Sequence, residues 1–147
     1  MKITICGSTR FKREWLFWNA LLTSQGHVVY SVAMWSHGPA VEQPSQDLKG
    51  MLDVVHLQKI TASDAVFVIN RYEFALNDPS KIDPSTRLYV GESTTREIQF
   101  AEVNQKPVMY VSDIDEVQGV LFRAYPRFIK EVCDVFKIKP EMVGLRT

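Results

Sequence analysis

The sequence predicts one domain of the α/β class, in which a parallel sheet lies between layers of helices. Its 147 residues are 46% hydrophobic and 23% charged, which is ordinary for a soluble globular domain. Short β-branched runs alternate with longer segments of helical period. Because parallel strands need crossover connections, this alternation is typical of strands joined by helices. No internal repeat or low-complexity tract divides the chain, so we expect a single domain over residues 1–147.

Four short segments have the composition of strands: Ile3–Cys6, Val28–Val32, Ala65–Ile69 and Pro107–Val111. The third is apolar at every position, which is typical of a parallel strand that is buried on both faces. We therefore expect Ala65–Ile69 to lie in the middle of the sheet.

Two helices are predicted between the first three strands. The first carries large apolar residues on one stripe and ends at a glycine: Phe11, Trp15, Trp18, Leu22 and Gly26. The second runs from about Asp47 to Thr61 and has apolar residues at near-helical spacing: Leu48, Leu52, Val55 and Ile60.

The second half of the chain predicts a long loop and further helices. Residues from Arg71 to Gly91 include two prolines and show little periodicity, and loops of that length are often functional. We interpret this segment as a lid or substrate loop. A helix is then predicted from near Thr94 to near Asn104. The chain from Ile114 to about Lys137 is predicted to be mostly helical, with an interruption at Pro126.

The charge balance and the two cysteines exclude several functions. Seventeen basic residues balance seventeen acidic ones, so no overall field attracts polymeric nucleic acid or an anionic membrane. No apolar stretch approaches the roughly 20 residues of a membrane helix, and no secretory signal is evident, so we expect a cytoplasmic protein. Cys6 and Cys133 have no Cys or His neighbours at metal-ligand spacing. We expect two buried free thiols, and neither a disulfide framework nor a zinc site.

The turn after the first strand is a candidate phosphate site. It combines a glycine, hydroxyl groups and a guanidinium in Cys6, Gly7, Ser8, Thr9 and Arg10. Amides at a helix N-terminus and a nearby arginine both suit an anion. The turn lacks both the GxGxxG fingerprint and the phosphate-loop motif, and most such turns bind nothing.

A second candidate segment opens the helix near Thr94, where Gly91, Ser93 and Thr94 precede Glu97. The first turn of this helix would direct the Glu97 carboxylate toward the carboxyl ends of the strands, where α/β proteins bind ligands. The alternative is structural, because Thr94-x-x-Glu97 also fits a capping box in which Glu97 only bonds back to the Thr94 amide.

Helix two supplies the third group, Asp53-x-x-His56-x-x-Lys59. This spacing places Asp53 beside His56, where either could protonate a leaving base or orient a sugar. A solvated helix face explains the same pattern. Asp64, directly before the central strand, is interpreted as a turn residue.

Three sets of motifs in this order resemble the nucleoside 2-deoxyribosyltransferase family. They are Cys6-Gly7-Ser8-x-Arg10, then Ser63–Val68, then Glu97-Ile98-x-x-Ala101 followed by Lys106-Pro107-Val108. The resemblance covers roughly residues 3 to 111 and is closest to the 2'-deoxynucleoside 5'-phosphate N-hydrolase branch.

The resemblance implies a flavodoxin-like or Rossmann-like three-layer fold with four to five strands, and a homodimer or larger assembly. It implies that Glu97 attacks C1' of a nucleoside or nucleotide and forms a covalent glycosyl-enzyme. Ser8 and Arg10 would lie at the 5'-phosphate. No metal or organic cofactor is implied. The substrate-binding residues expected overall are Cys6, Gly7, Ser8, Arg10, Gly91, Ser93 and Thr94.

The chain departs from the family pattern at two positions. The hydrolase branch has an aspartate where this sequence has His56, with Asp53 one turn earlier, so the general acid is left open between them. A tyrosine of the first strand is replaced by Thr4. Tyr72 or Tyr89 is the expected substitute for that aromatic.

The sequence therefore predicts cleavage or exchange of the bond between a base and a sugar, by double displacement with retention. A 2'-deoxy sugar is favoured, because the missing hydroxyl eases positive charge at C1'. One alternative is a phosphoribohydrolase of the cytokinin-activating type, whose PGGxGTxxE signature is GESTTRE here. The other is a non-catalytic nucleotide sensor.

Overall fold

The computed structural model describes residues 1–9, 11–33, 43–71 and 88–146. Its sheet contains β1 (Lys2–Gly7), β2 (Val28–Tyr30), β3 (Ala65–Ile69) and β4 (Val108–Tyr110). The order is β2-β1-β3-β4, and every pairing is parallel. β3 is fully buried between β1 and β4, as predicted from its unbroken apolar run.

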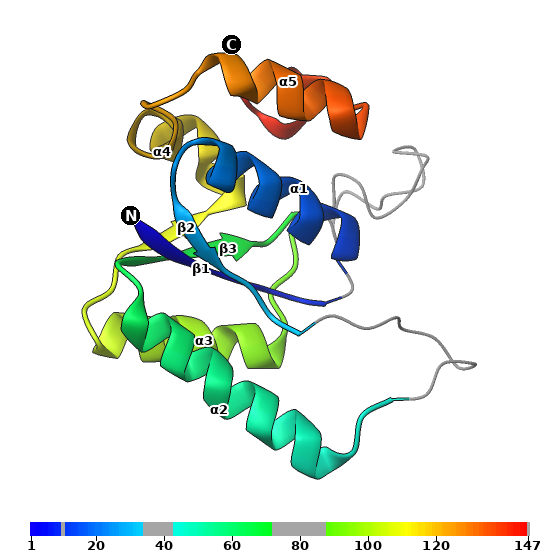
Figure 1. Cartoon of the computed structure of the whole chain (residues 1–147). Helices are drawn as coiled ribbons and strands as arrows, with labels where there is room; N and C mark the ends of the chain where they lie inside the picture. Colours follow the sequence, from blue (N-terminus) through cyan, green and yellow to red (C-terminus); the bar gives the residue numbers. More distant parts are fainter. Residues whose placement is uncertain (10, 34–42, 72–87, 147) are drawn as a thin grey trace.

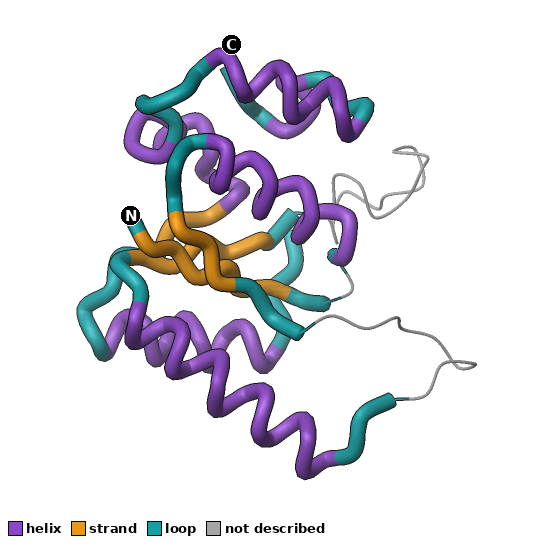
Figure 2. The backbone as a smooth tube through the Cα atoms, in the orientation of Figure 1, coloured by secondary structure: helices purple, strands orange, loops and turns teal. Residues whose placement is uncertain are grey.

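Helices cover both faces of the sheet and give the predicted three-layer α/β architecture (Figures 1 and 2). On one face lie α1 (Lys12–Ser24) and α4 (Ile114–Leu121), and α5 (Arg127–Phe136) packs on the outer side of α1. On the other face lie α2 (Gln46–Ala62) and α3 (Glu92–Val103). Short 3-10 turns occupy Val111–Asp113 and Pro140–Val143. Within the described part of the chain, no helix has the length and apolar character that crossing a membrane requires.

Most predicted boundaries agree with the structure to within two residues. Gly26 has the left-handed φ of 86° that suits a helix stop, and Pro126 is the N-cap of α5, which confirms the predicted interruption. β2 is shorter than predicted because the chain leaves β1 after Tyr30. Of the predicted substrate loop, residues 72–87 lie outside the described residues, and Arg71 forms an antiparallel bridge with Leu88.

Helix α2 exists where it was predicted, but its buried face differs from the apolar stripe. The residues that it buries are His56 and Ile60, whereas Leu48 is 48% exposed. The N-terminal half of α2 extends beyond the sheet (Figure 1), so its apolar residues have no strand beneath them. The interpretation of His56 as part of a solvated helix face is therefore wrong.

Candidate active site

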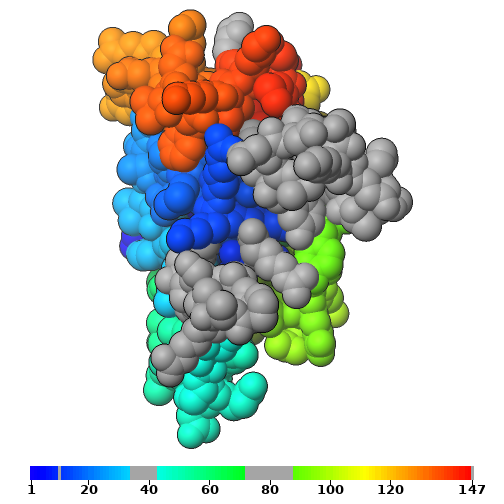
Figure 3. Space-filling view, turned by 90° about the vertical axis from the view of Figure 1, so that its right-hand side faces the viewer, coloured from blue at the N-terminus to red at the C-terminus, as the bar shows by residue number. Residues whose placement is uncertain are grey.

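A cavity of about 450 Å³ lies at the carboxyl ends of the central strands. From β1 the chain continues to β2 on one side of it, and then crosses to β3 on the other side. The strand order therefore reverses between β1 and β3, and α/β proteins bind ligands at the carboxyl ends of strands at such a point. Figure 3 faces this edge, with the start of α1 in blue between α2 below and α5 above. Segments distant in sequence thus converge on one site.

The structure brings most of the predicted site residues together. Eight of them line the cavity: Gly7, Ser8, Asp53, His56, Gly91, Ser93, Thr94 and Glu97. Two do not fit this description. Arg10 lies outside the described residues, and Cys6 is fully buried behind the cavity wall. Cys6 was predicted to contact substrate, but its side chain does not line the cavity. Its thiol faces His56 instead.

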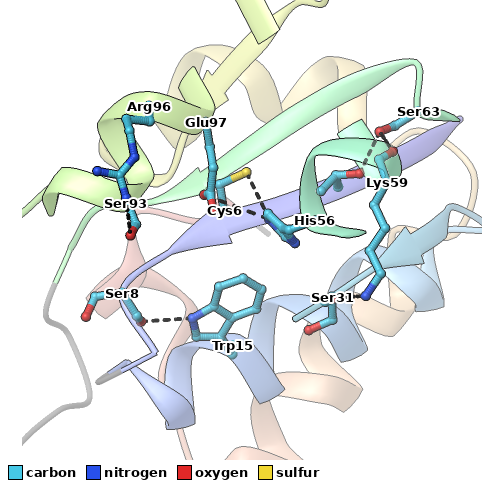
Figure 4. Close-up of polar contacts among 11 residues, drawn as sticks. Cys6, Ser8, Trp15, Ser31, His56, Lys59, Ser63, Ser93, Arg96 and Glu97 are labelled. Carbon is cyan, nitrogen blue, oxygen red and sulfur yellow. Dashed lines mark hydrogen bonds and ion pairs between the residues drawn. The ribbon is translucent and has the colours of Figure 1, made fainter. Parts of the chain in front are cut away.

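The turn after β1 is tightly constrained. A Cβ atom at Gly7 would lie 2.9 Å from the carbonyl oxygen of Ile69 in the paired strand, so a side chain there would push β1 and β3 apart. The carbonyl oxygen of Ser8 accepts hydrogen bonds from the Phe11 amide and from the Trp15 indole, each at 3.0 Å (Figure 4). This arrangement fixes the start of α1 at the cavity.

Helix α3 begins two residues before the predicted start, and this bears on whether Glu97 caps the helix. Its N-cap is Gly91, without a side-chain capping bond, so Thr94 lies inside the first turn and is buried. The capping-box alternative is therefore wrong. Glu97 lies on the second turn and its side chain extends to Cys6 and His56 (Figure 4).

Cys6, His56 and Glu97 form a buried polar cluster from β1, α2 and α3. The Cys6 sulfur lies 3.5 Å from Nε2 of His56, and the same nitrogen lies 3.8 Å from Oε2 of Glu97. The two side chains of the latter pair are 4% and 14% exposed, respectively. Water screens this cluster only weakly, so its charges interact strongly with their surroundings.

Burial decides the protonation of the cluster. It raises the pKa of Glu97 to about 7, against a smaller opposing effect of the bond from Cys6, while the Asp53 carboxylate raises it further. Burial also lowers the pKa of His56 to about 4, and the charge of Lys59 contributes in the same direction. The pKa of the Cys6 thiol is raised by burial and by Glu97. At neutral pH the imidazole is neutral and Glu97 is close to its midpoint.

Two other polar residues named from the sequence lie away from the cavity. Lys59 donates a hydrogen bond of 2.6 Å from Nζ to the carbonyl oxygen of Ser31, which ties α2 to the chain after β2. Asp64 accepts a bond of 2.7 Å from the amide of Lys2. This confirms that Asp64 is a turn residue.

The cavity also contains a basic residue that sequence reasoning missed. Lys49 lines it from α2, one turn before Asp53, and the four-residue spacing between them was the available signal.

Tyr89, one of the two expected aromatic substitutes, lines the cavity and packs edge-on against Phe11 with ring centroids 6.0 Å apart. Tyr72 lies outside the described residues.

The site thus combines a buried carboxylate, a neutral imidazole, a second carboxylate on the cavity wall and the N-termini of α1 and α3. Such an arrangement suits a small polar ligand with an anionic end and an electrophilic carbon near Glu97. No family model, curated protein or solved structure matches this chain.

Proposed function

We propose that the protein is an N-glycosidase or deoxyribosyltransferase that acts on nucleosides or their 5'-monophosphates, with Glu97 as the nucleophile. The observation that carries this proposal is the placement of Glu97. Its carboxylate is 14% exposed, it lines a cavity of about 450 Å³, and it does not cap its own helix. Small-molecule sites commonly enclose roughly 300–1,000 Å³.

The chemistry proceeds in two displacements. The Glu97 carboxylate attacks C1', the bond to the base breaks, and an acid protonates the departing base. Water or a second base then attacks C1' and releases Glu97. The sugar carbon develops positive charge in both steps, and the nearby carboxylate stabilises it. A missing 2'-hydroxyl lowers the barrier, so a 2'-deoxy sugar is the preferred substrate.

Asp53 is the better candidate for the acid. Nε2 of His56 faces Cys6 at 3.5 Å and Glu97 at 3.8 Å, so it is directed away from a departing base. Asp53 is exposed on the cavity wall, where the base would leave. His56 then positions the nucleophile.

A 5'-phosphate would occupy the end of the cavity nearest the two helix N-termini. Ser8 and Thr9 lie before α1, and Ser93 and Thr94 lie in the first turn of α3. Helix N-termini favour anions through their unpaired amides and their dipoles. Lys49 adds a positive charge to the same cavity. These features support a monophosphate substrate over a free nucleoside.

The test is Glu97→Gln, assayed by chromatography for base release from a panel of deoxynucleosides and their monophosphates, with and without an acceptor base. Glutamine preserves size but is not a nucleophile, so we expect base release to fall on the order of 10⁴-fold or more. Glu102→Gln is the matched control, because Glu102 is an exposed carboxylate of the same helix and lies outside the cavity.

Wild-type base release should also decrease as the pH falls through about 7, because burial raises the pKa of Glu97 to that value and the protonated acid does not attack. Full turnover by Glu97→Gln on every nucleotide would exclude the mechanism. Faster release from AMP than from dAMP would instead favour a phosphoribohydrolase. Tight nucleotide binding in calorimetry without base release over hours would favour a sensor.

A further inference from the structure

The polar cluster has a property that the proposed glycosidic reaction does not use. One ligand atom from each of Cys6, His56 and Glu97 lies within 4.8 Å of the other two. The three residues belong to β1, α2 and α3, so three independent elements converge on one point. A thiol, an imidazole and a carboxyl group are the side chains that bind transition metals in proteins.

Two of the three separations within the cluster are close to those of tetrahedral coordination. Zinc binds sulfur at about 2.3 Å, imidazole nitrogen at about 2.0–2.1 Å and carboxylate oxygen at about 2.0–2.2 Å, which places neighbouring ligand atoms about 3.3–3.6 Å apart. The Cys6 sulfur and Nε2 of His56 are 3.5 Å apart. Nε2 and the Glu97 oxygen are 3.8 Å apart. All three ligand atoms lie within 4.8 Å of one another, so side-chain rotations that draw them closer would place them at three corners of a tetrahedron.

The donor set also indicates which cation is favoured. Calcium and magnesium prefer shells made only of oxygen, whereas a thiolate with an imidazole suits zinc and its spectroscopic substitute cobalt. The imidazole also presents the required atom, because Nε2 of His56 is the nitrogen that faces both Cys6 and Glu97. The Cys6 thiol would lose its proton to solvent on binding.

We propose that Cys6, His56 and Glu97 form a binding site for a divalent cation of the zinc class, with the fourth coordination position open to the cavity. His56 and Glu97 line the cavity while Cys6 lies behind them, so the open position faces the space where a small ligand would enter. Sites with three protein ligands and one open position are typical of exchangeable or reactive zinc.

Occupancy would control the glycosidic reaction. A cation bound to the Glu97 carboxylate withdraws the electron pair that attacks C1', so metal binding and glycosyl transfer exclude each other. This consequence rests on the proposed function, whereas the site itself does not. Zinc-class cations are therefore expected to inhibit base release reversibly, and chelation is expected to restore it.

The direct test is a titration of chelator-treated protein with Co²⁺ in the absence of any nucleotide. We expect one cation per chain, a thiolate-to-cobalt charge-transfer band in the near ultraviolet, and intense visible bands typical of tetrahedral cobalt. Cys6→Ala should lose the charge-transfer band. Cys133→Ala is the matched control, because it removes the other buried thiol and should leave the band unchanged.

Two further variants separate metal binding from folding. Cys6→Ser retains a side chain of similar size, so a cooperative melting curve with no charge-transfer band would assign the loss to the missing sulfur. Glu97→Gln should retain the band but weaken Co²⁺ binding by at least about tenfold, the loss seen when residues that merely orient ligands are removed.

The proposal is overturned if wild-type protein shows no charge-transfer band at saturating Co²⁺, if the band persists in Cys6→Ala, or if it disappears in Cys133→Ala. These outcomes are independent of the proposed function, which is measured as base release in the presence of chelator. Cobalt binding without base release would support the metal site and contradict the proposed glycosidic function. Base release without cobalt binding would sustain the glycosidase alone.

Discussion

The two faces of the sheet bury very different side chains. Toward α1 and α5, the described residues form an apolar cluster of 19 buried members that includes Trp15, Phe17 and Trp18. Toward α2 and α3, the buried apolar cluster has five members: Cys6, Ile60, Val66, Val68 and Ala101. The first face therefore buries mainly apolar side chains, while the second also accommodates buried polar side chains.

The alternation along β1 shows how one strand serves both purposes. Ile3 and Ile5 belong to the large cluster, while Thr4 and Cys6 point to the other face. Thr4 is satisfied there by a hydrogen bond of 2.6 Å with Ser63, and Cys6 faces His56. Because buried polar groups contribute less than apolar ones and are expensive when unpaired, we infer that stability comes mainly from the first face. The second face provides the site.

The largest expected effect breaks the apolar face. Phe67→Ala should lower the free energy of unfolding by about 3–5 kcal/mol, because the ring is fully buried and lies edge-on to Trp18 with centroids 5.4 Å apart. Denaturant unfolding measures the loss. Val66 is the preceding residue and faces α2. Val66→Ala should lower the free energy of unfolding by about 2 kcal/mol. Equal losses at these two positions would contradict the contrast between the faces.

On the polar face, a substitution of Glu97 should raise the free energy of unfolding, whereas substitutions on the apolar face lower it. Burial raises the pKa of Glu97 from 4.5 to about 7, so the folded protein binds this proton more tightly than the unfolded chain. The resulting stability is present below pH 4.5 and is lost as the pH rises through 7. At pH 8, Glu97→Gln should therefore raise the free energy of unfolding by up to about 3 kcal/mol, as measured by thermal or denaturant unfolding.

His56 provides the control, because its pKa is lowered by burial from 6.5 to about 4. The stability linked to His56 is present above pH 6.5 and is lost as the pH falls through 4. Glu97→Gln should therefore lose stability on acidification from pH 6.5 to 4. His56→Gln should gain stability as the pH falls from 7 to 4.5. Slopes of the same sign in both variants would disprove this division of roles.

The smallest expected effect concerns the part of α2 that extends beyond the sheet. Ser45 caps this helix by accepting a hydrogen bond of 3.2 Å from the Leu48 amide. Ser45→Ala should lower the free energy of unfolding by about 1 kcal/mol, and hydrogen exchange should increase in the first turns of α2. Ser45→Asp retains an acceptor and should restore both values. No change in Ser45→Ala would indicate that the cap is unimportant.

Periodicity was sufficient for the architecture. The apolar run Ala65–Ile69 correctly predicted a buried central strand, and the geometry of parallel sheets correctly placed Gly7 and Glu97 at a common edge. The nucleoside chemistry, the family resemblance, the cytoplasmic location and the oligomer remain predictions. These properties depend on substrates and partners, which strand and helix patterns do not specify.

The polar cluster was beyond sequence reasoning for a physical reason. Metal-ligand motifs are recognised by residues close in sequence, whereas Cys6, His56 and Glu97 meet only through the packing of three elements. The buried face of α2 was also missed, because an apolar stripe indicates the inner face only where a sheet lies beneath it. Leu48 lies in the part of α2 that extends beyond the sheet and is exposed. His56 lies farther along the helix, over β1.

The close approach of two strands at Gly7 restricts how this protein can diversify. With the Ile69 carbonyl only 2.9 Å from where a Cβ atom would be, the floor of the cavity tolerates no added side chain. A change in the shape of the cavity must therefore come from its walls, which α2 and α3 help to form. An attempt to change which ligand the cavity accepts should leave position 7 untouched and vary the lining residues Lys49, Leu52 and Ser93 instead.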